Sequence, residues 1–174
     1  MDDIVLNKAE IIERCVRRVR EVHAGDAAAF RDDLTRQESV LLNLQRACEA
    51  AIDLAMHLVR RGRLGIPKAS REAFDLLERA GTLPAALAAP LRSMVGFRNV
   101  AVHDYRRLDL DVVEAIIDRH LDDLLAFTRL ALQLRDPRSR ATCRAHRDRR
   151  RWLVARRALS ACAASTPTAP PPPR

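Results

Sequence analysis

The fold class is decided by one stretch, residues 27–59, which reads AAAFRDDLTRQESVLLNLQRACEAAIDLAMHLV. Apolar side chains recur in it at intervals of three, four or seven residues, which places them on one face of a helix. This stripe consists of Leu34, Leu41, Leu44, Cys48, Ile52, Ala55 and Val59. At 1.5 Å per residue, a helix of about 30 residues is roughly 45 Å long. The stretch therefore predicts a long helix that forms the spine of a helical bundle.

The same helical spacing continues on both sides of this stretch, and glycine and proline separate the segments. Gly25 ends a first helix, and Gly81 ends a short helix that follows the spine. Pro84 and Pro90 each fit the first turn of a helix, and Asp109 fits an N-cap. We predict these further helices over residues 4–22, 70–80, 84–102 and 109–131. No run predicts a strand, so the expected fold is an all-α bundle of about five helices with a long second helix.

Charge divides the chain into two parts. The formal net charge is +8, but residues 1–134 hold 20 Lys and Arg against 21 Asp and Glu. Residues 135–174 hold 11 Arg against 2 Asp, and Arg, Ala and Pro fill 25 of the 40 positions. Proline-rich, strongly charged segments of this kind do not pack a core. We therefore predict one helical domain over residues 1–134 and a basic, mostly disordered tail over residues 135–174.

Composition excludes several classes of protein. Six aromatic residues are too few for an RNA reader that stacks bases on aromatic side chains. The longest uncharged stretch of the domain, residues 80–91, is shorter than the about 20 apolar residues that span a membrane. The cysteines lack the spacing of a zinc site, and Cys15 and Cys48 fall on apolar helix faces as buried thiols. We expect a cytoplasmic protein without a membrane segment, a bound metal or a cofactor.

Polar residues gather in residues 96–105, GFRNVAVHDY, directly after an apolar helical run. Arg98 and His103 are five positions apart, so on a continuous helix they lie about 140° apart. If the helix ends near Val102, His103 can turn back and the two side chains can converge. Arginine binds two phosphate oxygens at once, and histidine exchanges a proton near neutral pH. The pair suits cleavage of an RNA phosphodiester, with Arg98 stabilising the phosphorane and His103 acting as general acid or base.

Asn99 and Tyr105 complete this set of polar residues. Asn99 can donate a hydrogen bond to a phosphate or hold the imidazole, and Tyr105 can orient a phosphate or accept a modifying group. Because one histidine per chain cannot easily serve as both acid and base, we expect a homodimer in which two copies share one cleft. The spacing alone leaves other roles open: His103 can cap the helix C-terminus, and Arg98 can pair with Asp104.

The sequence around these residues resembles the HepT-like family of the HEPN superfamily, whose signature is Arg-x4-His-x-Tyr. Residues 98–105 read RNVAVHDY and match all three signature positions. The approach SREAFDLL at 70–77, with GF at 96–97, and the exit LDLD at 108–111 are also similar to the family's sequences. The resemblance covers residues 2–134 and implies a HEPN-type helical bundle.

The resemblance also implies an activity. HepT-like proteins are ribonuclease toxins that cut RNA without a metal at a cleft between two protomers, and the signature Arg and His are their catalytic residues. On this basis Arg98 and His103 are the expected catalytic residues, and Asn99 is a supporting residue. The family's partner is MntA, a minimal nucleotidyltransferase antitoxin that silences the toxin by transferring AMP from ATP to the signature tyrosine. That residue is Tyr105, the one tyrosine of the chain.

Two questions stay open from the sequence. The alternative to a nuclease is a non-catalytic helical module that binds a nucleotide or a nucleotidyltransferase partner. The tail 135–174 has no counterpart that we recognise in the family, and three interpretations compete for it. It is an arm that attracts RNA through its arginines, a neutral disordered extension, or the product of a frame change in a GC-rich gene.

Overall fold

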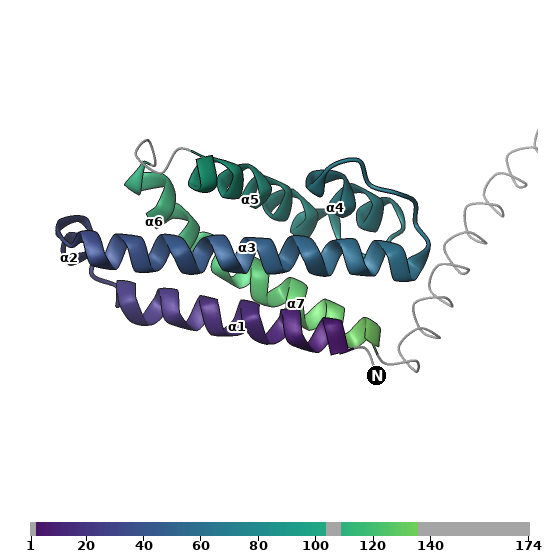
Figure 1. Cartoon of the computed structure of the whole chain (residues 1–174), viewed down its shortest axis with the longest axis horizontal. Coiled ribbons are helices and arrows are strands. Elements are labelled where there is room, and N and C mark those ends of the chain that lie inside the picture. Colours follow the sequence, from purple (N-terminus) through teal and green to yellow (C-terminus); the bar gives the residue numbers. More distant parts are fainter. Residues whose placement is uncertain (1–2, 104–108, 136–174) are drawn as a thin grey trace, which may run out of the picture. The chain divides into compact units, whose positions relative to one another are not determined.

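The computed structural model describes residues 3–103 and 109–135, and all the regular structure in these two ranges is α-helical. The helices are α1 (Asp3–His23), α2 (Ala27–Asp32), α3 (Leu34–Gly62), α4 (Ser70–Arg79), α5 (Ala85–His103), α6 (Leu110–Arg119) and α7 (Leu121–Arg135). Figure 1 shows the long helix α3 running between α1 and α5. The predicted all-α class is confirmed. None of these helices is long and apolar enough to cross a membrane.

The described ranges contain seven helices, where the sequence predicted about five. Two of the predicted helices are each interrupted at one residue. Asp33 separates α2 from α3, because its backbone is extended and its carboxylate accepts hydrogen bonds from the N–H groups of Thr35 and Arg36. His120 separates α6 from α7. A break of one residue barely disturbs the apolar spacing, so the period of the sequence does not reveal it.

The two prolines near the start of α5 occupy different positions. Pro84 precedes the helix, and its carbonyl oxygen accepts hydrogen bonds from the N–H groups of Leu87 and Ala88. Pro90 lies inside the helix and not in a first turn, which corrects the prediction. A proline at this position removes one backbone hydrogen bond, but its φ angle is compatible with a helix. α5 therefore continues through Pro90 as a single element.

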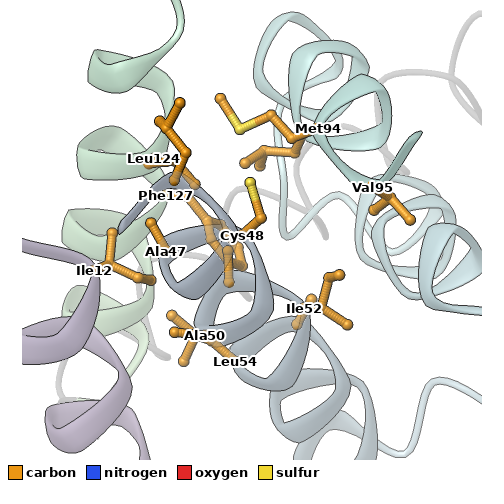
Figure 2. Packing of buried hydrophobic residues seen from close by; sticks show 14 of the residues in the cluster. Ile12, Ala47, Cys48, Ala50, Ile52, Leu54, Met94, Val95, Leu124 and Phe127 are labelled. Carbon is orange, nitrogen blue, oxygen red and sulfur yellow. The ribbon is translucent and has the colours of Figure 1, made fainter. Parts of the chain in front are cut away.

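The core is built around α3, as its apolar stripe predicted. Helices α1, α4, α5 and α7 all contact α3. Figure 2 shows side chains of α1, α5 and α7 gathered around α3. The stripe residues from Leu41 to Val59 are buried, whereas Leu34 is 62% exposed because it is the first residue of the helix. Cys15 and Cys48 are buried free thiols, as predicted. The long helix is thus confirmed, with its start moved from residue 27 to Leu34.

Two arginine clusters anchor the helices on either side of residues 104–108. Arg92 of α5 binds two carboxylates of α4, Asp75 at 2.9 Å and Glu78. Arg31 of α2 binds two carboxylates of α6, including Glu114 at 2.8 Å. The Arg92 cluster joins two consecutive helices, whereas the Arg31 cluster joins helices that are distant in sequence. α5 is therefore tied to α4, and the start of α6 to α2, by contacts outside residues 104–108.

Candidate active site

One helix, α5, carries three of the four predicted site residues, Arg98, Asn99 and His103. The helix continues one residue beyond the predicted end at Val102, so His103 is its last residue. Five positions along a continuous helix lie about 140° apart, and α5 therefore does not bring Arg98 and His103 to one face. His103 is described by its helical backbone alone, and Tyr105 lies outside the described residues.

Arg98 is held by an acidic side chain that the sequence did not point to. Its Nε donates a hydrogen bond to Oε2 of Glu49 on α3 at 2.6 Å, and its Nη1 donates to Oδ1 of Asn99 at 3.3 Å. The Arg98 side chain is 29% exposed and that of Glu49 is 45% exposed. An ion pair as open to water as this one contributes about 1 kcal/mol or less to folding. Its main consequence is that it fixes the direction of the guanidinium.

The contact with Glu49 determines which edge of the guanidinium is free. A guanidinium presents its N–H donors in one plane, and in Arg98 the Nε–H is directed at Glu49. The outer edge, formed by Nη1 and Nη2, has only the Asn99 oxygen as a partner within the described part of the chain. This edge has the geometry to bind two oxygens of one phosphate. Arg98 is therefore positioned to hold an anion.

The thiol of Cys48 is next to Glu49 in the sequence but belongs to the core. Burial raises the pKa of the Cys48 thiol to about 12; the Glu49 carboxylate adds to this rise and Arg98 opposes it. The thiol stays protonated at neutral pH and is a poor nucleophile. In residues 3–103 and 109–135, no three His, Cys, Asp or Glu side chains are grouped in a way that could hold a metal ion.

Nothing in the sequence pattern singles out Glu49 as the partner of Arg98. The partner considered from the sequence, Asp104, lies outside the described residues. Glu49 stands 49 positions before Arg98, and the packing of α5 on α3 brings the two together. The available signal was an acidic residue beside the apolar stripe of the spine. Asp53, one turn later, gives the same signal but binds Lys8 at 2.6 Å. Spacing alone could not distinguish the two acids.

A groove between α5 and α6, which we call the α5–α6 groove, lies beside the motif helix. It has a volume of about 500 Å³, and its wall includes Met94, Phe97 and Val100 of α5 and Val112 and Ile116 of α6. Val100 and Val112 are each 48% exposed, which is high for valine side chains on neighbouring helices. The sequence analysis did not predict this groove. Its lining offers an apolar surface within two residues of Arg98.

Comparison with known proteins places this chain in a class of helical ribonucleases. The family described as "Ribonuclease HepT-like" matches residues 12–131. The chain is 47% identical over 127 residues to the "mRNA nuclease HepT" of Shewanella oneidensis, and the match covers 73% of this chain and 95% of that protein. The chain belongs to the HepT-like ribonuclease family. The predicted family and the predicted enzyme class, a ribonuclease, are confirmed.

Solved structures of toxin–antitoxin complexes are similar to the chain as well. One contains a tri-AMPylated HEPN toxin of Shewanella oneidensis in complex with an MNT antitoxin; it is 46% identical with a TM-score of 0.71, and the match covers 75% of this chain and 97% of that chain. Another is a crystal structure of a toxin–antitoxin with AMP-PNP, 45% identical with a TM-score of 0.71, covering 75% of this chain and 99% of that chain. Sequence identity and structural similarity therefore both support the HEPN-type fold that the resemblance implied.

Proposed function

We propose that the chain is the toxin of a HepT/MntA-type toxin–antitoxin pair, a metal-independent endoribonuclease that cuts RNA at a cleft between two copies. The observation that carries this proposal is the orientation of Arg98. Glu49 holds the guanidinium by its Nε–H, and among the described residues the outer edge has only the Asn99 oxygen as a partner, so it can bind a phosphate on the helix that also ends in His103. In this scheme Arg98 and His103 are catalytic, Asn99 supports Arg98, and Glu49 is a positioning residue.

The proposed reaction uses the 2′-hydroxyl of the RNA as the nucleophile. One His103 takes the proton of the 2′-hydroxyl while its oxygen forms a bond to phosphorus. The bond from phosphorus to the 5′-oxygen breaks, and that oxygen takes a proton from a second His103 in its protonated, imidazolium form. Arg98 stabilises the additional negative charge on the phosphorane oxygens in between. The products are a 2′,3′-cyclic phosphate and a 5′-hydroxyl, and the proton count is balanced.

A second copy of the chain supplies the second His103 in this scheme. The α5–α6 groove supports a homodimer, because its apolar wall and the exposed Val100 and Val112 suit contact with another protein. Two copies related by a twofold axis near the end of α5 would bring two Arg98 and two His103 residues to one cleft. Arg98 and His103 lie about 140° apart on one helix, so in such a dimer each protomer can present Arg98 to one side of the cleft and His103 to the other.

The proposal includes Tyr105 as the site of inactivation by AMP transfer. A related toxin is tri-AMPylated in its complex with an MNT antitoxin, and Tyr105 is the one tyrosine of this chain. AMP attached two residues after the end of α5 adds bulk and negative charge where an RNA phosphate has to bind. Intact-mass analysis after co-expression with a neighbouring nucleotidyltransferase gene tests this. We expect mass additions of whole AMP units on the wild type and none on Tyr105→Phe.

The experiment that tests the function itself is RNA cleavage by the purified chain with an excess of a chelator. We expect cleavage that is unaffected by the chelator and is lost in His103→Ala. A chain that binds a nucleotidyltransferase but never cuts RNA would favour the alternative, a non-catalytic helical module. We also propose that residues 1–134 are the functional domain, since the family match ends at residue 131. A chain truncated after Leu134 is then expected to keep its kcat.

A further inference from the structure

A second groove lies between α1 and α3, and the mechanism proposed above makes no use of it. It has a volume of about 320 Å³, and we call it the α1–α3 groove. Polar and charged side chains form much of its wall: Lys8, Arg14, Asn43, Arg46, Glu49 and Asp53. The α5–α6 groove, by contrast, is mostly apolar. The α1–α3 groove therefore suits a polar ligand.

The acidic side chains of this groove are already neutralised. Asp53 binds Lys8 at 2.6 Å, and Glu49 binds Arg98 at 2.6 Å. Each carboxylate therefore has a positive partner, and neither opposes the approach of an anion as a free charge. Any further cation in the groove adds to its net positive charge.

Arg14 and Arg46 are such cations. Both are exposed, and neither has an acidic partner among residues 3–103 and 109–135. They line the groove together with Cys15, which is buried. Burial raises the pKa of the Cys15 thiol, and both guanidinium groups oppose that rise, because they are close enough to favour the thiolate. Two uncompensated positive charges thus act on one small volume.

Glu49 connects this groove to the candidate active site. Its carboxylate lines the α1–α3 groove and also holds Arg98. Arg46 precedes Glu49 by three positions, which is one helical turn and about 4.5 Å along the axis of α3. Figure 1 shows α3 between α1, the helix of Arg14, and α5, the helix of Arg98. Glu49 and Arg46 of α3 therefore link the groove to the helix that carries Arg98.

We propose that the α1–α3 groove binds the single-stranded RNA on one side of the cleaved bond, with Arg14 and Arg46 contacting its phosphates. This inference rests on the proposed ribonuclease function and adds the path of the substrate to it. It also resolves a difficulty of charge. Residues 1–134 carry slightly more acidic than basic residues, yet the domain has to hold a polyanion. Internal pairing of the acids leaves a local positive surface at the site where the strand needs it.

The test is RNA binding by the full-length chain, measured by fluorescence anisotropy with His103→Ala as the parent so that the RNA stays intact. The probes are labelled RNAs of 12 and 3 nucleotides, and the test variant carries Arg14→Gln and Arg46→Gln. Arg71→Gln is the matched control, because Arg71 is an exposed arginine of α4 that lines neither groove. Melting temperatures establish that all the proteins are folded.

We expect the double variant to bind the 12-nucleotide RNA more weakly and with less dependence on salt. Each lost phosphate contact lowers the slope of log affinity against log salt by about 0.7, so two lower it by about 1.4. Between 50 and 200 mM salt the double variant then loses about sevenfold less affinity than its parent. The 3-nucleotide RNA, which is too short to fill both the cleft and the groove, is expected to bind equally to both.

Three results would overturn the proposal. The first is a double variant that behaves like Arg71→Gln with the long RNA. The second is an equal loss with both RNAs, which would place the two arginines in the cleft. The third is unchanged RNA binding with weaker capture of a co-expressed nucleotidyltransferase, which would assign the groove to a protein partner. Cleavage by the chain with an intact His103 is measured in parallel. Its absence contradicts the proposed function, while the binding measurement still decides the role of the groove.

Discussion

The α5–α6 groove and the α1–α3 groove differ in chemistry, and each is linked to Arg98, the first through Val100 of the same helix and the second through its partner Glu49. The α5–α6 groove is apolar and includes the exposed Val100 and Val112. The α1–α3 groove is polar, and Arg14 and Arg46 leave it with a positive charge. The chemistry of each groove therefore fits a different kind of partner. The apolar groove suits a second copy of the chain, and the charged groove suits a nucleic acid.

The largest loss of activity is expected from substitutions of Arg98 and His103. We expect Arg98→Ala to lower kcat by about 10²–10³-fold and His103→Ala by about 10²–10⁴-fold, because they remove charge stabilisation and proton transfer in the transition state. Arg98→Lys keeps the charge but loses the planar fork, so it is expected to restore only part of the rate. Single-turnover cleavage of a labelled RNA measures these effects. Wild-type cleavage rates in both alanine variants would show that neither Arg98 nor His103 is catalytic.

The next prediction concerns the apolar groove. Val112→Asp places a carboxylate in the expected interface, and burying it without a partner costs several kcal/mol. We expect the dimer dissociation constant to rise by at least about 100-fold and cleavage to fall at concentrations where the dimer dissociates. Light scattering and analytical ultracentrifugation measure the oligomeric state. Ile66→Asp is the control, because Ile66 is 92% exposed and lines neither groove. Dimers of equal stability in both variants would show that the α5–α6 groove is not part of the dimer interface.

A smaller loss of activity is expected from substitution of Glu49, which lines the α1–α3 groove and holds Arg98. Glu49→Ala frees the Arg98 guanidinium, and the pair is exposed enough that its direct contribution is about 1 kcal/mol, or roughly fivefold in kcat. We expect Glu49→Gln to recover part of this loss, since its amide oxygen can still accept from Nε. The control is Asp75→Ala, which removes a contact of Arg92 elsewhere on α5. A kcat that falls equally in the control would indicate a general disturbance of α5.

The effect that is smallest at neutral pH concerns the stability of the fold and the thiol of Cys48, beside Glu49. The folded state holds the Cys48 proton up to a pKa of about 12, whereas the ordinary value is 9.0. Between these values the unfolded chain binds fewer protons than the folded chain, so the free energy of unfolding falls as the pH rises from about 9 towards 12. Cys48→Ala is expected to flatten this part of the stability curve. Denaturant titrations at several pH values measure it, and an unchanged slope in Cys48→Ala would contradict the assignment.

Much of the fold could be predicted from spacing, because apolar periodicity reports which face of a helix is buried. It identified the spine from Leu41 to Val59 and both buried thiols. It did not identify the breaks at Asp33 and His120, since a single capping residue leaves the period nearly intact. The apolar spacing also predicted that Leu34 is buried. Leu34 is exposed because it is the first residue of α3 and has fewer neighbours.

The site was predictable only in its local part. Arg98, Asn99 and His103 lie on one helix and share a motif, so the sequence could group them. Glu49 could not be found in this way, because the register between α3 and α5 decides which acid reaches Arg98. Both grooves depend on the same packing. Non-local contacts of this kind are set by how helices cross, which a pattern within one helix does not specify.

The most direct test of the account is the chemistry of the ends that the enzyme leaves on RNA. Mass spectrometry of fragments cut in the presence of a chelator distinguishes the possible reactions. We predict 2′,3′-cyclic phosphate and 5′-hydroxyl ends, in equal yield with and without the chelator, and none with His103→Ala. Fragments with 3′-hydroxyl and 5′-phosphate ends, or the same fragments from His103→Ala, would contradict cleavage by Arg98 and His103.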